Sequence, residues 1–200
     1  PLAVSAGYGT AFFRSDTRIA TPDIQIHFII FSTDRMGQNL HPFSGFTASV
    51  CHLRPESRGT IHLRSADPGQ SPSIRVNYLS TDEDRRAVVD GLKFLRSIMQ
   101  APAMLDYASE EIEPGPACAS NQDLLAYCRA KGSTIYHPSG TCRMGVDPGA
   151  VVSPDLKVKG LSGLRVADGS IMPQLVSGNT NAAIIMIGEK ASDLILGESL

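Results

Sequence analysis

The sequence predicts an α+β fold: an antiparallel sheet backed by helices, followed by a C-terminal strand and helix. Four segments between residues 22 and 79 carry the apolar alternation or short apolar runs typical of strands, and only short turn-rich segments join them. Because no helix separates these strands, we expect them to pair in antiparallel fashion. Two helical segments follow near residues 80–100 and 120–131, where they could back the sheet.

The composition is that of a globular protein with a sizeable core. The chain has 200 residues, of which 42% are hydrophobic and 19% charged. That length suffices for one large domain or two small ones. The net charge of −2 gives no electrostatic reason to expect nucleic acid or an anionic membrane as a partner. The longest apolar runs, at residues 24–31 and 182–188, are too short for a transmembrane segment.

The cysteines are scattered and form no Cys-x-x-Cys pair, so we expect reduced thiols and a cytoplasmic location rather than a disulfide framework. They are Cys51, Cys118, Cys128 and Cys142. We expect no signal peptide. The chain begins with proline rather than methionine, which suggests a fragment or a processed product.

The N-terminal half is expected to hold the sheet. Residues 1–20 are predicted to be an irregular lead-in, because their Gly-x-Gly pair at Gly7 and Gly9 lacks a third glycine and a following helix. Residues 56–59 (ESRG) are predicted to form the turn of a hairpin, and residues 67–73 form another turn cluster. The predicted strands are residues 24–31, 46–55, 59–65 and 73–79.

The first helix is predicted to start at a cap, Ser80 or Thr81, with acidic residues in its first turn where the helix dipole favours them. Its apolar stripe should lie on the sheet and comprises Val88, Leu92, Leu95 and Met99. The second helix is predicted to begin after Ser120, in a sequence resembling a capping box, and to end at Lys131 before Gly132.

The tail has a different pattern. Short β pieces separated by glycines fill residues 151–173, and residues 164–170 (LRVADGS) are predicted to end a strand at an Asp-Gly turn. A helix is predicted from Thr180 to about Leu196. One side of it carries Ile184, Ile187, Ala191 and Leu194. We therefore divide the chain into a lead-in of residues 1–20, an α+β unit of residues 21–150 and a separate segment of residues 151–200.

His137 is a candidate general base. It lies in residues 135–145 (IYHPSGTCRMG), where glycines, a proline and small hydroxyl residues would let a flat cofactor approach closely. A lone histidine is more often structural, and that alternative stays open on the residues alone. The other histidines are interpreted as structural or solvent-facing; they are His27, His41, His52 and His62.

Asn179, Thr180 and Asn181 stand where the last helix begins. N-capping alone would explain one of them. A helix N-terminus carries partial positive charge and free amide donors, which suits it to stabilise negative charge on the N1–C2=O edge of a reduced flavin. The pair Asp168-Gly169 could form an ordinary turn or contact the ribityl or phosphate groups of such a cofactor.

Cys142 and Ser139 are further candidates, as nucleophiles. No second cysteine or histidine stands at ligand spacing from Cys142, so no metal site is expected, and a small packing residue is the better interpretation. Ser139 lacks a nucleophile-elbow pattern. A metal- or thiol-dependent hydrolase therefore stays as an alternative function that no specific motif supports.

Blocks of sequence along nearly the whole chain resemble the C-terminal part of the glucose–methanol–choline (GMC) oxidoreductases, in particular choline and other alcohol dehydrogenases. These blocks are residues 22–28, 53–68, 73–96, 136–145, 164–173 and 178–195. The resemblance implies that residues 21–150 form the substrate-binding domain. It also implies that the C-terminal strand and helix complete a Rossmann-like FAD-binding domain whose N-terminal part is absent from these residues.

The resemblance implies roles for individual residues. His137 would be the catalytic base, and Asn179 its partner at a place where some members carry a second histidine. Asn181 and the backbone at Ala182 would lie by the flavin C2 carbonyl. Asp168 and Gly169 would lie near the FAD chain, and Thr180 is grouped with these cofactor-binding positions.

The implied activity is oxidation of a primary alcohol to an aldehyde, with the hydroxyl proton going to His137 and hydride to flavin N5. The implied partners are a small-molecule alcohol and the N-terminal FAD domain of the same protein, and exposed apolar faces could also support a homodimer. The 200 residues alone are expected to be inactive and not to retain FAD. The alternative is a non-catalytic substrate-binding fragment without redox activity.

Overall fold

The computed structural model describes residues 7–34 and 37–197, and these divide into two compact units. The N-terminal unit comprises the chain up to residue 57 together with residues 79–132, and the C-terminal unit comprises residues 58–78 and the chain from residue 133 onward. The chain thus leaves the N-terminal unit and returns to it. The backbone N–H of Ser80 donates to the Ser57 hydroxyl at 2.9 Å across this excursion. The predicted division at residue 150 concerns domains of a longer protein and stays a prediction.

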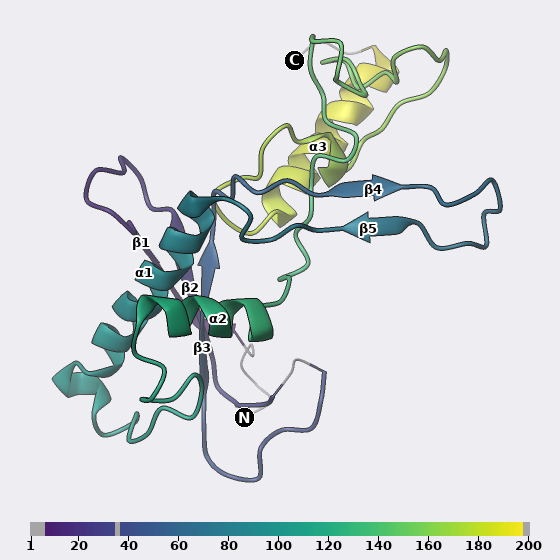
Figure 1. Ribbon diagram of the computed structural model, residues 1–200. Helices are drawn as coiled ribbons and strands as arrows, with labels where there is room; N and C mark the ends of the chain where they lie inside the picture. Colours follow the sequence, from purple (N-terminus) through teal and green to yellow (C-terminus); the bar gives the residue numbers. More distant parts are fainter. Residues whose placement is uncertain (1–6, 35–36, 198–200) are drawn as a thin grey trace. The chain divides into compact units, whose positions relative to one another are not determined.

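The N-terminal unit is built on a three-stranded antiparallel sheet in the order β1-β2-β3 (Figure 1). Its strands are β1 (Gly7–Phe13), β2 (Ile24–Ile29) and β3 (Thr47–His52). Ile24 pairs with Phe13 on one side and with His52 on the other. The predicted antiparallel pairing is confirmed for the strands at residues 24–31 and 46–55, each of which is shorter than predicted.

The prediction of an irregular lead-in is wrong for residues 7–13. This segment forms edge strand β1, and its residues Thr10 to Phe13 pair regularly with β2. The two glycines mark an irregularity, because the register shifts between Gly7 and Gly9. Residues 1–6 of the predicted lead-in lie outside the described residues.

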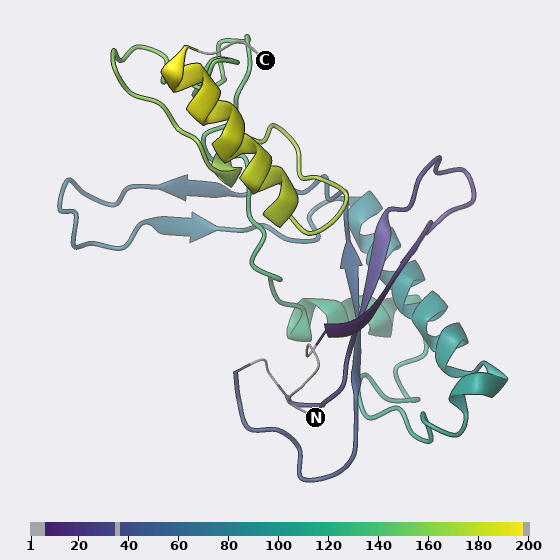
Figure 2. The same cartoon turned by 180° about the vertical axis from the view of Figure 1, so that it is seen from behind.

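Both predicted helices of this unit are confirmed. Helix α1 (Asp82–Met99) is capped by the Thr81 side chain, which accepts from the N–H of Asp84. Helix α2 (Asn121–Lys131) begins with a complete capping box between Ser120 and Asp123 and ends at Gly132. Helix α1 packs against β3 and β2, and α2 packs against α1 (Figure 2). A short 3₁₀ turn, η1 (Pro102–Met104), follows α1.

The face of α1 that contacts the sheet differs from the predicted stripe. Of the predicted residues, Leu95 is buried, whereas Val88, Leu92 and Met99 are only half-buried. The helix turns small residues, Ala87 and Gly91, toward the sheet instead. A Cβ atom on Gly91 would lie 2.5 Å from a methyl group of Val50, so the helix approaches β3 more closely than a larger residue would permit.

The C-terminal unit contains the hairpin formed by β4 (Thr60–His62) and β5 (Ser73–Arg75). The predicted hairpin turn at residues 56–59 is therefore wrong, since β3 pairs with β2 and β4 with β5. The backbone N–H groups of Glu56 and Ser57 instead donate to the carboxylate of Asp84, which anchors this segment to α1. The turn cluster at residues 67–73 connects the hairpin strands (Figure 2).

The rest of this unit packs against one side of helix α3 (Asn181–Leu196), which confirms the predicted C-terminal helix. The segment from 151 to 166 forms isolated β-bridges, such as Lys157 with Arg165, and the strand predicted at residues 164–170 does not form. A 3₁₀ turn, η2 (Gly169–Ile171), follows instead. The core contains Val152, Leu156, Ile171, Met172, Ile187 and Ala191. Completion of a Rossmann-like sheet stays a prediction.

Across the described residues, no helix combines the length and apolar character that a bilayer crossing requires.

Candidate active site

The histidine segment is fixed to η2 by backbone hydrogen bonds. Gly140 adopts a left-handed conformation, with φ of 86°, and its carbonyl accepts from the N–H of Arg143. Beyond this turn, the N–H of Cys142 donates to the carbonyl of Ser170 at 3.0 Å, and that of Met144 donates to the carbonyl of Ile171 at 2.8 Å. The segment that carries His137 therefore runs beside the Asp-Gly turn.

The Asp-Gly turn, η2, packs against the start of α3. A Cβ atom on Gly169 would lie 3.2 Å from Ile184 Cδ1, so a glycine permits the close approach of η2 to α3. Ile171 from η2 and Ile187 from α3 share one buried core. This packing brings the N-terminal end of α3 to the histidine segment.

Three predicted site residues meet at this place. The Nδ2 atom of Asn179 lies 3.1 Å from Nε2 of His137, and Oγ1 of Thr180 lies 2.9 Å from Nδ1 of the same ring. Asn179 is 42 positions from His137 in the chain. Each imidazole nitrogen thus has one partner, and both partners come from the residues that precede α3.

These contacts define one protonation pattern for the ring. An amide nitrogen is a donor, so Asn179 Nδ2 donates to a lone pair on Nε2, and the ring proton of neutral His137 is on Nδ1. The oxygen of Thr180 then accepts from Nδ1. In this tautomer Nε2 is the basic nitrogen, and it lies beside an amide donor.

The two sides of the ring differ in exposure. Thr180 is 4% exposed, whereas His137 is half-buried and Asn179 is exposed. Within this chain, the basic nitrogen therefore lies on the accessible side of the site and the protonated nitrogen on the buried side. Such an arrangement can take a proton from a group that binds at the Asn179 side.

The first turn of α3 suits a polar or anionic group. It contains no acidic residue, and the side chain of its cap residue makes no capping hydrogen bond. Asn181 and Ala182 are exposed at this end, and a Cβ atom on Gly178 would meet nothing within 4 Å. The helix end therefore fits the carbonyl edge of a flavin ring, because the positive end of the helix dipole is not neutralised by a carboxylate of its own first turn.

Asp168 is exposed and caps η2. The hydroxyl and backbone N–H of Ser170 hold the pKa of Asp168 below its ordinary value of 3.8, with the backbone bond at 2.8 Å. The carboxylate is therefore ionised at neutral pH and could accept from a ribityl hydroxyl. This geometry also serves an ordinary turn, so it is compatible with both interpretations made from the sequence.

The structure gives no feature that favours Cys142 as a nucleophile. Cys142 is half-buried, and its backbone is part of the pairing with η2. Within residues 7–34 and 37–197, no group of three metal-binding side chains gathers in one place.

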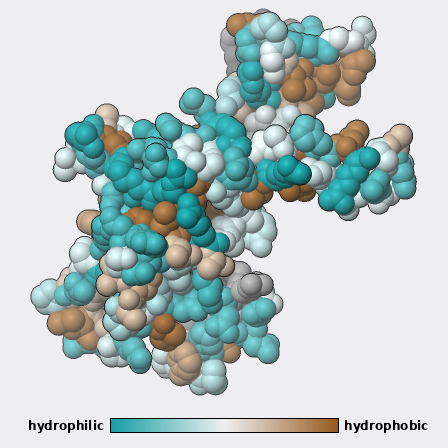
Figure 3. All heavy atoms as spheres, in the orientation of Figure 1, coloured by the Kyte–Doolittle hydropathy of each residue, from teal (hydrophilic) through white to brown (hydrophobic). Residues whose placement is uncertain are grey.

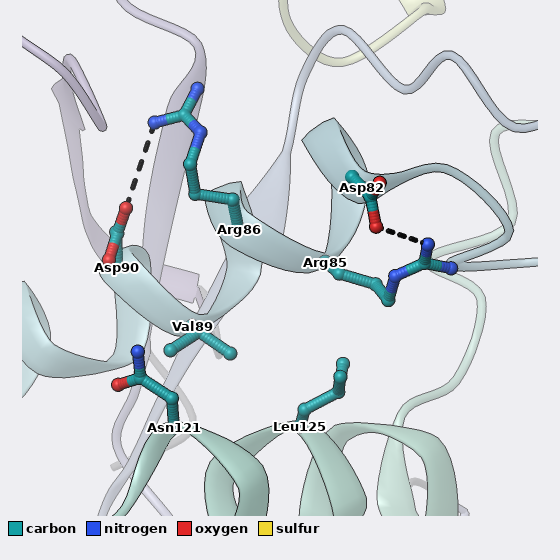
Figure 4. A pocket seen from close by; sticks show the side chains of 7 residues that line it. All are labelled: Asp82, Arg85, Arg86, Val89, Asp90, Asn121 and Leu125. Atoms are coloured by element: carbon teal, nitrogen blue, oxygen red, sulfur yellow. Dashed lines mark hydrogen bonds and ion pairs between the residues drawn. The ribbon is translucent and has the colours of Figure 1, made fainter.

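A separate hollow lies between α1 and α2 in the N-terminal unit (Figure 4). The apolar Val89 and Leu125 line it, and ion pairs between Arg85 and Asp82 and between Arg86 and Asp90 lie at its rim. None of the residues predicted for the site lines this hollow. Its full lining is Asp82, Arg85, Arg86, Val89, Asp90, Asn121 and Leu125.

Comparison with known proteins assigns the chain to a family. Residues 55–188 match the family model described as GMC oxidoreductase. An alcohol dehydrogenase [acceptor] of Pseudomonas putida is 45% identical over 185 residues, covering 92% of this chain and 34% of that protein. An oxygen-dependent choline dehydrogenase of Escherichia coli is 43% identical over 187 residues, covering 94% and 33%. The chain thus spans about a third of the length of the curated relatives it matches.

Solved structures give the same result. Pyridoxine 4-oxidase from Mesorbium loti superposes with a TM-score of 0.87 at 28% identity, covering 98% of this chain and 39% of that one. A formate oxidase from Aspergillus oryzae RIB40, studied for FAD modification, has a TM-score of 0.82 at 26% identity and covers 90% and 32%. On this evidence the chain belongs to the GMC oxidoreductase family.

Proposed function

We propose that the chain is the C-terminal catalytic part of an FAD-dependent oxidoreductase that oxidises a primary alcohol, choline-like or other, to an aldehyde. The observation that carries this proposal is the meeting of His137 with Asn179, which joins a basic nitrogen to an amide donor on the accessible side of the site. The two similar dehydrogenases, named for alcohol and for choline, support the substrate class.

The chain's own residues would bind the alcohol and remove its proton. The hydroxyl group would insert between the amide of Asn179 and Nε2 of His137, replacing their direct 3.1 Å contact. Asn179 would donate to the alcohol oxygen while His137 accepts the hydroxyl proton at Nε2. Holding the oxygen from two sides also orients the carbon that carries it, which lowers the entropic part of the barrier.

FAD would supply the acceptor for the two electrons and the hydrogen that leave the alcohol carbon. The residues that would hold it are at the α3 N-terminus, where Asn181 and the backbone at Ala182 would face the C2 carbonyl, and at Asp168 and Gly169. The resemblance also implies a cofactor-binding role for Thr180, but its contact with Nδ1 of His137 supports a different role.

Apolar side chains at the surface of the C-terminal unit support a partner in the rest of the same protein. Helix α3 exposes Ile185, Met186 and Leu196. Figure 3 shows hydrophobic side chains, in brown, at the surface of this part of the chain. Because such surfaces are normally covered, we propose that the N-terminal FAD domain covers them. The 200 residues alone should then be purified without colour, and a yellow preparation with FAD at full occupancy would contradict this. A homodimer and a cytoplasmic location stay predictions.

The decisive test is the rate of flavin reduction by alcohol in the full-length protein under anaerobic stopped-flow conditions. General base catalysis contributes about a hundred- to ten-thousand-fold, so His137→Ala should slow reduction by at least about a hundredfold. His62→Ala is a matched control, because His62 lies exposed in β4 of the same unit and should leave the rate unchanged.

The substrate is identified by a screen of primary alcohols, choline included, on the full-length protein with oxygen and with an artificial electron acceptor. Aldehyde formation from at least one alcohol is expected. If His137→Ala were reduced at the wild-type rate, the proposed mechanism would be wrong. If no alcohol reduced the flavin, the proposed reaction itself would be wrong.

A further inference from the structure

We infer that Thr180 is a positioning residue for His137: its hydroxyl oxygen accepts a hydrogen bond from the Nδ1–H group and so holds the ring with Nε2 on the accessible side of the site. The inference rests on the proposed function, in which Nε2 of His137 removes the alcohol proton. Thr180 would then support the general base His137 and would not bind the cofactor.

The geometry gives Thr180 the shorter of the two contacts to the ring. Its Oγ1 lies 2.9 Å from Nδ1, compared with 3.1 Å between Asn179 Nδ2 and Nε2. Thr180 is also buried at 4% exposure, whereas Asn179 is exposed. A bound alcohol can therefore replace the Asn179 contact while the Thr180 contact persists. Thr180 is the fixed support of the ring during the reaction.

Thr180 stands at the N-cap of α3 but does not cap the helix with its side chain. The two other N-cap hydroxyls of α-helices in the described residues both cap their own helix: Thr81 accepts from the N–H of Asp84, and Ser120 from that of Asp123. Both have extended backbone, whereas Thr180 has helical angles of φ −80° and ψ −10° and makes no capping bond. Its hydroxyl is directed to the imidazole, although capping is the common use of a threonine at this position.

The protonation pattern follows from what each partner can do. A threonine hydroxyl both donates and accepts, so it would tolerate either ring tautomer. The amide nitrogen of Asn179 only donates, and this fixes Nε2 as an acceptor and leaves the ring proton on Nδ1. When Nε2 takes up the alcohol proton, Nδ1 keeps its hydrogen and Thr180 continues to accept it. The transfer thus requires no rearrangement on the buried side of the ring.

The first test compares Thr180→Val and Thr180→Ser in the FAD-containing full-length enzyme. Valine keeps the shape and removes the hydroxyl, whereas serine keeps the hydroxyl. Since a single buried hydrogen bond is worth a factor of about ten, Thr180→Val should slow flavin reduction about tenfold, with a smaller change in KM. Thr180→Ser should stay within about twofold of the wild-type rate. Equal rates for Thr180→Val and wild type would overturn the inference.

The pH dependence separates this role from simple packing. The Nδ1–H bond to Thr180 is stronger in the imidazolium than in the neutral ring, because a charged donor makes the stronger bond. Its loss in Thr180→Val should therefore move the acidic limb of the pH–rate profile to lower pH, and Thr180→Ser should restore it. A slower enzyme with an unmoved limb would indicate packing alone. A limb moved to higher pH would mean that Thr180 donates, and both outcomes reject the inference.

A second readout needs no alcohol and no turnover. Long-range ¹H–¹⁵N spectra of the ¹⁵N-histidine-labelled holoenzyme distinguish the two tautomers, and the His137 signals are those that vanish in His137→Gln. Wild type should carry the proton on Nδ1. Thr180→Val should keep this tautomer, because Asn179 fixes it, but its Nδ1–H proton signal should move upfield or be lost to exchange with water, because the proton has lost its acceptor. A wild-type ring protonated on Nε2 would reject the inference even if Thr180→Val did not fold.

The outcomes distinguish this inference from the proposed function. If His137→Ala reduced its flavin at the wild-type rate, the proposed function would fail, and the spectra would still report on the contact with Thr180. If His137→Ala were slow but Thr180→Val matched wild type in rate, pH profile and Nδ1–H signal, only the present inference would fail.

Discussion

Replacing Asp84 with alanine should destabilise the N-terminal unit far more than any other acidic substitution in the first turn of α1. The Asp84 side chain is 3% exposed, and its two oxygens accept from the N–H groups of Glu56 and Ser57 at 2.8 and 2.9 Å. Burial acts to raise the pKa of Asp84, but the hydrogen bonds from Ser57 and Glu56 outweigh it and leave the pKa below 3.8. The carboxylate is thus a charged anchor between the helix and the segment that leaves β3.

The size of the effect follows from these two bonds. Two hydrogen bonds to a charged group contribute about 3–6 kcal/mol, and removal of one partner of a buried charged contact costs about 3–5 kcal/mol. We therefore expect the free energy of unfolding to fall by about 3–5 kcal/mol. Asp84→Asn keeps one acceptor oxygen but turns an NH₂ group toward a backbone donor. It should therefore lose about half as much. In a chain of this size, about 3–5 kcal/mol corresponds to a fall in Tm of roughly 6–20 °C.

Urea unfolding of the full-length protein at pH 7, followed by a probe in the N-terminal unit, measures this loss. Asp82→Ala is the matched control, because it removes the same charge from a position two residues earlier. The Asp82 side chain is 100% exposed, and the ion pair it forms is with Arg85. Such a surface pair is worth about 0–1 kcal/mol. If Asp84→Ala and Asp82→Ala unfolded at the same urea concentration, the carboxylate anchor would not stabilise the unit.

Three further predictions concern pH and the site. Burial lowers the pKa of His52 below 6.5, so the unfolded chain binds more protons than the folded one at mildly acidic pH. Stability measured by urea unfolding should therefore fall as pH drops below about 6.5, and His52→Gln should reduce this dependence while His62→Gln, at an exposed position, should not. Gly140→Ala should lower the free energy of unfolding by about 1–2 kcal/mol, since φ is 86° there, and an unchanged Tm would contradict this. Asn179→Ala should slow flavin reduction about ten- to a hundredfold, because it removes a donor to the alcohol oxygen, and this loss should be smaller than that of His137→Ala. Stopped-flow absorbance measures the rate, and a wild-type rate would exclude the contact of Asn179 with the alcohol.

Features governed by local sequence were predictable. The capping box at Ser120 and the cap at Thr81 set the starts of α2 and α1, and both are confirmed. The end of α2 at Gly132 likewise follows from local chemistry. These elements could be predicted because their start and stop signals lie within a few residues of one another.

Features that depend on distant partners were not predictable. The segment at residues 56–59 contains good turn residues, but its backbone donors bind Asp84, which lies 28 positions beyond Glu56. The stripe of α1 was misplaced because hydrophobicity alone does not show that Gly91 allows contact with Val50. In each case the tertiary partner decided the structure over the local pattern.

The candidate site was predictable only in part. The meeting of His137 and Asn179 was implied by resemblance to a family, and nothing in their spacing of 42 positions required it. The resemblance implies a cofactor contact for Thr180, and its position between two asparagines does not show whether its hydroxyl faces the cofactor or the His137 imidazole. The contact of its Oγ1 with Nδ1 of His137, a residue 43 positions away, shows which direction the hydroxyl takes.

The short bridge between Ser57 and Ser80 has a practical consequence for dissecting the protein. The peptide departs toward the β4–β5 ribbon and comes back at two points joined by one hydrogen bond of 2.9 Å. Joining residues 57 and 80 through one or two residues would delete the ribbon and leave the sheet and helices α1 and α2 uninterrupted, since these elements lie outside residues 58–78. The shorter connection would also lower the entropy cost of closing the loop. The same splice removes the ribbon from the unit that contains α3, so it suits a chain that ends at residue 132, whereas residues 133–200 expressed alone would lack part of their own unit.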